Sequence, residues 1–522
     1  MTFGVFSRPG GRGVARRTAS AALLLAALAA LLGPAPARAD AAAAELFAKH
    51  KAYMGWSAGD GSITSLRESG AVTRDGKELR EIESLHRGEV FRERSGSYQD
   101  GFTGRVLWQS NQNGFTVRAN GDAARYVATR QALFGEWLDT TSATVVRSEV
   151  LDGTPVTWVR VTPSVGVPAE IAIDPATGAY KRAVLDPNGD YETSIAILGY
   201  TDVGGGKRVI SSWKYGSGRA IYAYTKIEAN VPISDQELHP PPQRAAWTFD
   251  PAHGTNPVQL TETRILVDAT VNGVKGTFIF DTGAFGIALT DTFARRVGAK
   301  RVGESQVYGI GGGARANVYK VDTIAFGASV LHNVVVETGL DERTSHFSNV
   351  AGLIGFDLLA GAIVDLNLDA KTMRILDPQS FEPDKNAGIT VPVDLTTQTP
   401  RVPMTVGGKV PVLAILDSGN PAWVLFSKSL ETRDHVSFFV DPTALVQEMR
   451  ISGINGSEVD PCGKLQSLNL GPIRYAPVPA CASDSMARNE VLVGLEFIRS
   501  FNTVFDYPDG YLVMTPRKNG RD

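Results

Sequence analysis

The sequence predicts a mainly β protein in which an N-terminal antiparallel β domain precedes two similar β lobes. Three observations carry this prediction. Short runs of β-forming residues alternate with turn signals from about residue 62 to residue 232. A run of three prolines, 240–242, then marks a stiff linker. Beyond it, an apolar run that ends in an aspartate on a turn occurs at 277–284 and again at 413–419.

Length and composition narrow the possible functions. At 522 residues the chain is long enough for roughly three domains of about 150 residues each. Its 43% of hydrophobic residues lies far from the composition typical of disorder. The 52 basic and 55 acidic residues nearly cancel, and the mature part has no basic block. This balance argues against nucleic acid or an anionic membrane as a partner.

The first 39 residues have the pattern of a signal peptide. Four arginines precede an apolar run from Ala21 to Leu32, and Ala37-Arg38-Ala39 offers a cleavage site before Asp40. The apolar run is too short to cross about 30 Å of hydrocarbon, and no cysteine near the cleavage site could carry a lipid anchor. We therefore expect removal of 1–39 and export to the periplasm or beyond. Arg16-Arg17 leaves the twin-arginine route open beside the general secretory route.

The chain has two cysteines, Cys462 and Cys481. Their closeness in an exported chain predicts a disulfide, and closing a loop of about 20 residues contributes roughly 3 kcal/mol on the chain-entropy model. Two unrelated buried thiols are the alternative. Because no histidines cluster with the pair, neither interpretation gives a zinc site, and we predict no metal.

Residues 40–238 are the predicted N-terminal β domain. A helix from Ala41 to Tyr53 comes first, and strands follow, with turn signals between them such as Asn120-Gly121. A helix followed by a long meander loosely resembles outer-membrane lipoprotein carrier proteins. The resemblance implies a half-barrel whose apolar concave face could hold an acyl chain or a peptide, with an envelope lipid or lipoprotein as partner. A spacer or propeptide-like domain with an ordinary core is the alternative.

Residues 239–257 are the predicted linker, and 258–380 and 388–518 are the two predicted lobes. In each lobe a hairpin turn leads into the aspartate strand, and a glycine-tipped hairpin follows the aspartate. An apolar-apolar-Gly motif then lies 74 residues after the first aspartate (355 − 281) and 77 after the second (494 − 417). Landmarks in the same order at nearly the same spacing predict an internal duplication.

These motifs resemble retropepsin-like aspartic proteases of the exported bacterial type, fused into a two-lobed, pepsin-like unit over 258–516. The resemblance implies that Asp281 and Asp417 are the catalytic pair and that the Thr282 and Ser418 hydroxyls bond across to the opposite lobe. Glycine after each hydroxyl residue permits the sharp turn, and the glycine-tipped hairpins become flaps over an extended peptide. The residues assigned in this way are Thr282, Gly283, Ser418 and Gly419 in the active-site turns, and Tyr308, Gly309, Gly311, Gly453 and Gly456 in the flaps.

Two abutting carboxylates provide the chemistry that amide hydrolysis needs. Like charges a few ångströms apart cannot both ionise cheaply, so the pair keeps one proton and acts as acid and base together. The sequence thus predicts an exported aspartic endopeptidase that cleaves polypeptides without a cofactor and works as a monomer with paired lobes.

Two departures from the family pattern leave another function open. Asn420-Pro421 follows the second D-S-G, where the family usually has a small residue, and the second flap has no aromatic residue. The alternative is a non-catalytic peptide- or lipid-binding envelope protein with degenerate protease lobes. A serine hydrolase that uses Ser57 in the G-x-S-x-G pattern 55–59 is disfavoured, because that motif needs a strand before it and a helix after it.

Overall fold

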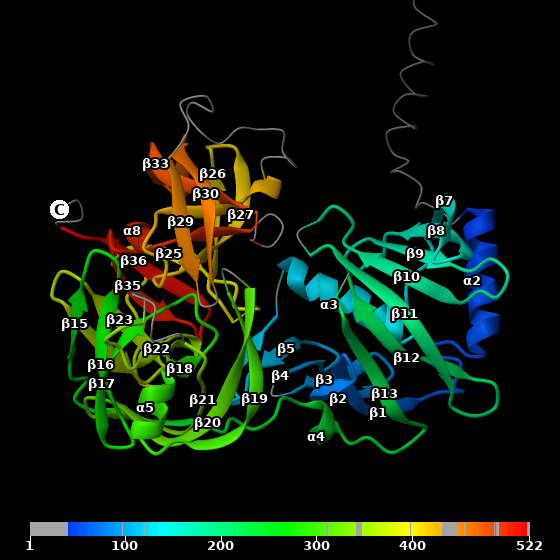
Figure 1. Ribbon diagram of the computed structural model, residues 1–522, viewed down its shortest axis with the longest axis horizontal. Coiled ribbons are helices and arrows are strands. Elements are labelled where there is room, and N and C mark those ends of the chain that lie inside the picture. Colours follow the sequence, from blue (N-terminus) through cyan, green and yellow to red (C-terminus); the bar gives the residue numbers. More distant parts are fainter. Residues whose placement is uncertain are drawn as a thin grey trace, which may run out of the picture.

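The structure is a computed structural model that describes residues 40–518 except 97, 120, 190, 217, 310–311, 341–346, 397, 431–446, 454–455, 485 and 487–489. The predicted signal peptide, 1–39, lies outside the described residues. The mainly β prediction is confirmed, because the chain builds sheets of 13, 14 and nine strands. Figure 1 shows the two lobes at one side of the molecule and the N-terminal sheet beside them. No helix within the described residues is long and apolar enough to cross a membrane.

The N-terminal domain is one antiparallel half-barrel sheet with two long helices packed on it. Its strand order is β6-β5-β4-β3-β2-β1-β13-β12-β11-β10-β9-β8-β7. Leu46 of the first helix and Leu133 of the second share a core cluster with Ile171 and Ile195 of the sheet. The elements are α2 Ala41–Met54, β1 Ser65–Arg74, β2 Lys77–Arg87, β3 Val90–Ser95, β4 Tyr98–Phe102, β5 Leu107–Ser110, β6 Thr116–Arg118, α3 Gly121–Phe134, β7 Thr144–Leu151, β8 Thr154–Val161, β9 Ala169–Ile173, β10 Tyr180–Leu185, β11 Thr193–Asp202, β12 Arg208–Tyr215, β13 Ala220–Ala229 and α4 Asp235–Leu238.

Helix α3 departs from the sequence prediction, which placed a turn at Asn120-Gly121 inside a run of strands. Asn120 lies outside the described residues, and Gly121 begins a helix of 14 residues. The segment contains several alanines and other good helix formers, and it buries Ala123 and Val127, four residues apart, on one face. The strand prediction is therefore wrong here, because the helical periodicity outweighs the Asn-Gly turn signal.

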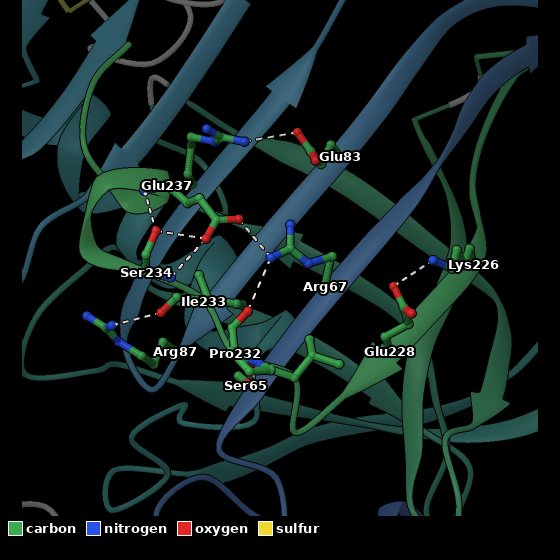
Figure 2. Close-up of polar contacts among 12 residues, drawn as sticks. Ser65, Arg67, Glu83, Arg87, Lys226, Glu228, Pro232, Ile233, Ser234 and Glu237 are labelled. Carbon is green, nitrogen blue, oxygen red and sulfur yellow. Dashed lines mark hydrogen bonds and ion pairs between the residues drawn. The ribbon is translucent and has the colours of Figure 1, made fainter.

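A strap, residues 231–238, anchors the end of the N-terminal domain across β1 and β2 (Figure 2). The Arg67 guanidinium donates to the Pro232 carbonyl at 3.3 Å and to the Glu237 carboxylate at 2.7 Å. Ser234 caps α4 in a reciprocal bond with Glu237. Because side chains alternate along a strand, Arg67 faces the strap, whereas its neighbour Glu68 faces the other side of the sheet.

The two lobes repeat one arrangement of strands around each aspartate. In the first, β17 pairs in parallel with β22, and β22 pairs antiparallel with β18. In the second, β27 and β34 are parallel, and β34 and β28 are antiparallel. The first lobe contains β15 Asn256–Leu260, β16 Ile265–Val271, β17 Val274–Phe280, β18 Ile287–Leu289, α5 Asp291–Arg296, β19 Lys300–Gly309, β20 Gly312–Phe326, β21 Ser329–Glu337, β22 Gly352–Ile354, α6 Phe356–Leu359, β23 Ile363–Asn367 and β24 Thr372–Leu376.

The second lobe contains β25 Ile389–Pro392, β26 Arg401–Val406, β27 Val410–Leu416, β28 Val424–Ser427, β29 Gln447–Gly453, β30 Gly456–Leu465, β31 Leu468–Leu470, β32 Ile473–Tyr475, β33 Val478–Ser483, β34 Val491–Val493, α8 Leu495–Ile498, β35 Phe501–Asp506 and β36 Tyr511–Pro516. The segment predicted as a linker also contributes a strand, since β14 Ala246–Thr248 pairs with β21. The predicted disulfide is confirmed: Cys462 of β30 and Cys481 of β33 are directly opposite each other and bonded.

A sheet shared by both lobes joins them. Strand β23 of the first lobe pairs with β35 of the second, with Val364 opposite Phe505. The Phe280 and Phe505 rings meet edge to face at 5.8 Å within one core cluster that spans the two lobes. The lobes are therefore fixed relative to each other by a continuous sheet and a common core.

Candidate active site

Each predicted catalytic aspartate stands at the end of a buried strand. The last three residues of β17, Phe278, Ile279 and Phe280, lie in the core, and Asp281 follows them where the strand ends. The Asp281 amide donates to the Ile354 carbonyl at 2.9 Å, which closes the turn against β22. In the second lobe the Asp417 amide makes the same bond to the Val493 carbonyl, also at 2.9 Å.

The residues after the aspartates bond across the lobe junction. The Thr282 hydroxyl donates to the Leu416 carbonyl at 2.7 Å and accepts from the Ser418 amide at 3.0 Å. Reciprocally, the Ser418 hydroxyl donates to the Phe280 carbonyl at 2.8 Å and accepts from the Thr282 amide at 3.0 Å. Both side chains are fully buried, so these four bonds form without competition from water and bring the two turns together.

The glycines of the two turns make room for the opposite carboxyl group. A Cβ atom on Gly283 would lie 2.4 Å from Cγ of Asp417, and one on Gly419 would lie 2.5 Å from Cγ of Asp281. Neither glycine has a positive φ. The sequence argument assigned these glycines to a sharp turn, and the structure corrects the reason: they are required by close approach across the junction.

Backbone amides orient the two carboxylates. The Gly283 amide donates to Oδ1 of Asp281 at 3.0 Å. Oδ1 of Asp417 accepts from the amides of Gly419 at 2.9 Å and Asn420 at 3.2 Å. The departure at Asn420 thus leaves this pattern of donors in place, because its backbone does the bonding.

Burial and mutual repulsion shift the pKa values of the two aspartates. Burial, and secondly the charge of Asp417, raises the pKa of Asp281 well above its ordinary value. Burial also raises the pKa of Asp417, while a hydrogen bond from Asp281 opposes that rise. Two carboxyl groups this close cannot both ionise cheaply, so one proton stays between them. Both directions favour a pair that carries one proton over a range of pH.

The apolar-apolar-Gly motifs lie directly behind the aspartate turns. A Cβ atom on Gly355 would lie 2.7 Å from the Asp281 carbonyl oxygen, and one on Gly494 would lie 2.6 Å from the Asn420 carbonyl oxygen. The Gly355 amide donates to the Gly286 carbonyl at 3.0 Å. Each glycine therefore lies so close to its turn that a larger residue could not take its place.

The predicted flaps are hairpins at the level of the backbone. Strands β19 and β20 pair as far as Gly309 opposite Gly312, with Tyr308 opposite Gly313. Strands β29 and β30 pair as far as Gly453 opposite Gly456. Gly311 and the prediction for the Tyr308 side chain lie outside what the structure describes.

The N-terminal domain contacts the first lobe near its aspartate turn, through residues that the sequence analysis did not select. Nδ2 of Asn111 donates to Oδ1 of Asp357 at 2.6 Å, and Oδ2 of Asp357 accepts from the Ile287 amide at 3.2 Å. The Asn113 side chain donates through Nδ2 to the Val335 carbonyl at 2.9 Å and accepts through Oδ1 from the Val335 amide at 2.7 Å.

Asp357 links the two domains from a fully buried position. Burial raises its pKa to about 7, against the bonds from Asn113 and Asn111, which lower it. The sequence signal was present but ambiguous: Asn113-Gly114 has the form of a simple turn, and Asp357 follows Gly355 and Phe356 at the start of α6. Only the fold shows that these side chains meet.

Within the described residues, no group of histidine, cysteine, aspartate and glutamate side chains could hold a metal ion. Asn111 and Asn113 follow β5, so this end of the N-terminal sheet lies next to the first lobe (Figure 1). Through Asp357, this contact reaches the Ile287 amide, six residues after Asp281.

The family comparison agrees with this geometry. The family model described as aspartyl protease matches twice, at residues 267–358 and 402–497, and each match contains one of the aspartate turns. No curated protein matches the chain. Among solved structures, the aspartic proteinase from Irpex lacteus is similar at 14% sequence identity and a TM-score of 0.33, over 51% of this chain and 98% of that one.

Proposed function

We propose that this chain, whose C-terminal half has the retropepsin-like, pepsin-like aspartic protease fold, hydrolyses peptide bonds with Asp281 and Asp417 as its acid and base. The observation that carries the proposal is the reciprocal bonding of Thr282 and Ser418 across the lobe junction, which holds the carboxyl groups side by side. Such a pair has the proton arrangement that amide hydrolysis requires.

In this mechanism Asp417 takes a proton from a water molecule held between the carboxyl groups, and the water oxygen attacks the peptide carbonyl carbon. Asp281 gives its proton to the carbonyl oxygen, which forms a tetrahedral diol. The C–N bond then breaks as the nitrogen receives the proton held by Asp417, and Asp281 recovers its own. Each carboxyl group changes role once, so the pair ends in its starting state.

The substrate that fits this site is an extended polypeptide. Each lobe contributes one hairpin, β19–β20 and β29–β30, and an extended chain bonds to strand edges through its backbone. This supports an endopeptidase, because backbone recognition does not depend on a chain end. The Cys462–Cys481 disulfide supports our proposal that the protein works in an oxidising compartment outside the cytoplasm.

The test is cleavage of a denatured protein mixture by the mature chain across pH, with and without a statine-type transition-state analogue. We expect Asp281→Asn and Asp417→Asn each to lower the rate by at least about 100-fold, since each removes one proton-transfer group. Asp268→Asn is the matched control, because Asp268 lies on β16 and bonds to Thr277 outside the site.

The pH profile adds a second criterion. Because the pKa values of both aspartates are raised, the singly protonated pair and the activity should persist to higher pH than an isolated aspartate would allow. Analogue-sensitive cleavage that disappears in both aspartate variants would establish the mechanism. Wild-type rates in either variant, with the fold intact by circular dichroism, would refute the shared pair.

A further inference from the structure

A cavity of about 50 Å³ lies inside the N-terminal domain, away from the aspartate pair. Its walls include Trp56, Trp137 and Phe134, and its polar lining includes Glu68, His86 and Glu93. The exposed residues Gly59, Thr64 and Gly88 also line it, so it reaches the surface between the loop before β1 and the β2–β3 turn. Its volume is several times the roughly 10–15 Å³ that one water requires.

A row of acidic side chains crosses the sheet at this cavity. Glu68 of β1 pairs with Ser84 of β2, Ser84 with Glu93 of β3, and Glu93 with Asp100 of β4, so their side chains share one face of the sheet. Arg130 of α3 bonds to Glu93 and, at 3.3 Å, to Asp100. The row thus contains three carboxyl groups, and one guanidinium, that of Arg130, forms ion pairs with two of them.

Glu68 is the carboxyl group of this row that Arg130 does not bond. Its side chain is 6% exposed, and among the described residues no cation forms an ion pair with it. Its partner is the Ser84 hydroxyl, which also lies 2.6 Å from Nε2 of His86. His86 is 7% exposed, and its Nδ1 atom has no hydrogen-bond partner in the described part of the chain. A buried carboxyl group without a counter-ion and a buried ring nitrogen without a partner therefore line the same cavity.

We propose that this cavity binds a primary ammonium group on a short apolar stem, with Glu68 as its counter-ion. An ammonium group has three donors, which suit three acceptors here: the Glu68 carboxylate, Nδ1 of His86 and the Glu93 carboxylate, which can accept more than one hydrogen bond. Trp56 and Trp137 provide aromatic faces that attract a cation and cover an apolar stem. The same chemistry occurs in a free alkylamine and at the end of a lysine side chain.

Charge balance favours a cation over an anion or a neutral polar group. The groups that face Glu68 are Ser84 and His86 from β2, Glu93 from β3, Tyr224 from β13 and, beyond Glu93, Arg130 from α3. Burial, and secondly the charge of Glu93, raises the pKa of Glu68 to about 8, and burial lowers that of His86 to about 4. These shifts favour a protonated Glu68 and a neutral His86 at neutral pH before a cation binds.

Binding of an ammonium ion should release a proton from Glu68, because the ligand charge stabilises the carboxylate. The test is isothermal titration calorimetry of the full mature chain with n-butylammonium chloride, at pH 7, in two buffers of different ionisation enthalpy. We expect saturable binding, an apparent enthalpy that changes with the buffer, and at least tenfold weaker binding of n-butanol, which has the same stem without the charge.

The Glu68→Gln variant should lose the preference for butylammonium over butanol and the release of the proton. Glutamine is the neutral isostere of the protonated form, so the variant should fold. Glu83→Gln is the matched control, since Glu83 lies on the opposite face of β2, where it bonds Arg92 at 3.0 Å. It should bind like the wild type.

A parallel titration with Nα-acetyl-lysine amide distinguishes the two sources of the ammonium group. Tighter binding than butylammonium assigns the cavity to a lysine-containing peptide, and weaker binding assigns it to free amines. Equal affinity for butanol and butylammonium, unchanged binding in Glu68→Gln, or no binding at concentrations well above the millimolar range would each overturn the proposal.

Discussion

Replacement of Thr282 by alanine tests how much the cross-lobe hydroxyl bonds contribute to the site. The change removes one hydroxyl that donates to the Leu416 carbonyl and accepts from the Ser418 amide. Both partners are backbone groups at a fully buried junction, since Thr282 is 1% exposed and Ser418 is 0% exposed. Thr282→Ser is the control, because it loses the methyl group and keeps the hydroxyl.

The magnitude follows from the two groups left without partners. A buried donor or acceptor that loses its hydrogen bond costs about 1–3 kcal/mol. Two such groups cost roughly 2–6 kcal/mol, and a water that entered the vacated space would bring the value toward the lower end. We therefore expect the alanine variant to be less stable than the serine variant by at least about 2 kcal/mol, and to lose more activity.

The assay is urea unfolding of the full mature chain, followed by near-ultraviolet circular dichroism, beside a cleavage assay on the same preparations. The reasoning predicts separate transitions for alanine and serine variants and a fall in kcat larger than any change in KM, because the loosened turns misplace the reacting groups. Coincident unfolding curves and equal rates for the two variants would refute the view that the hydroxyl holds the junction.

Three further predictions concern other parts of the chain. Asn111→Ala should lower the thermal midpoint, because the buried Asp357 carboxyl loses a donor at 2.6 Å, worth about 1–3 kcal/mol. Cys462→Ser with Cys481→Ser should lower the unfolding free energy by roughly 3 kcal/mol, since the crosslink closes a loop with a sequence separation of 19. The pKa of Glu68 is raised from its ordinary value of 4.5 to about 8 in the folded chain by burial. The wild type should therefore lose stability relative to Glu68→Gln as pH rises from about 4.5 to 8, by up to about 5 kcal/mol.

Each of these predictions has a clear contrary result. An unchanged thermal midpoint in Asn111→Ala would mean that this hydrogen bond does not contribute to the stability of the chain. Equal urea midpoints for the wild type and the double serine variant, in the absence of reductant, would contradict the disulfide estimate. A Glu68→Gln difference that stays constant between pH 5 and pH 8 would show that Glu68 ionises as readily in the folded chain as in the unfolded chain.

The sequence was sufficient to locate the aspartate turns. Two apolar runs that end in D-T-G and D-S-G, with matching landmarks downstream, carry the same local information twice. Local signals also indicate the hairpins: Asn272-Gly273 adopts φ values of 46° and 81°, as a tight hairpin turn requires. These features depend on residues close together in the chain, which is why pattern analysis could find them.

Features that depend on distant residues were missed. Asn111 and Asp357 are 246 residues apart in the chain, and nothing local to either residue indicates the other. The acidic row from Glu68 to Asp100 requires the register of four strands, which turn signals alone do not fix. Helix α3 was missed for a different reason, since a turn signal at its start was given more weight than the alanine-rich segment behind it.

The reciprocal bonds of Thr282 and Ser418 have the form of an isologous contact between two identical subunits, in which each partner offers the other the same group. A symmetric pair made from separate copies must carry every sequence change twice. Here one chain supplies both halves, so a change can appear on one side alone. Asn420-Pro421 and the Cys462–Cys481 bridge belong only to the second lobe. The symmetric centre can therefore stay intact while the surroundings of its two halves diverge.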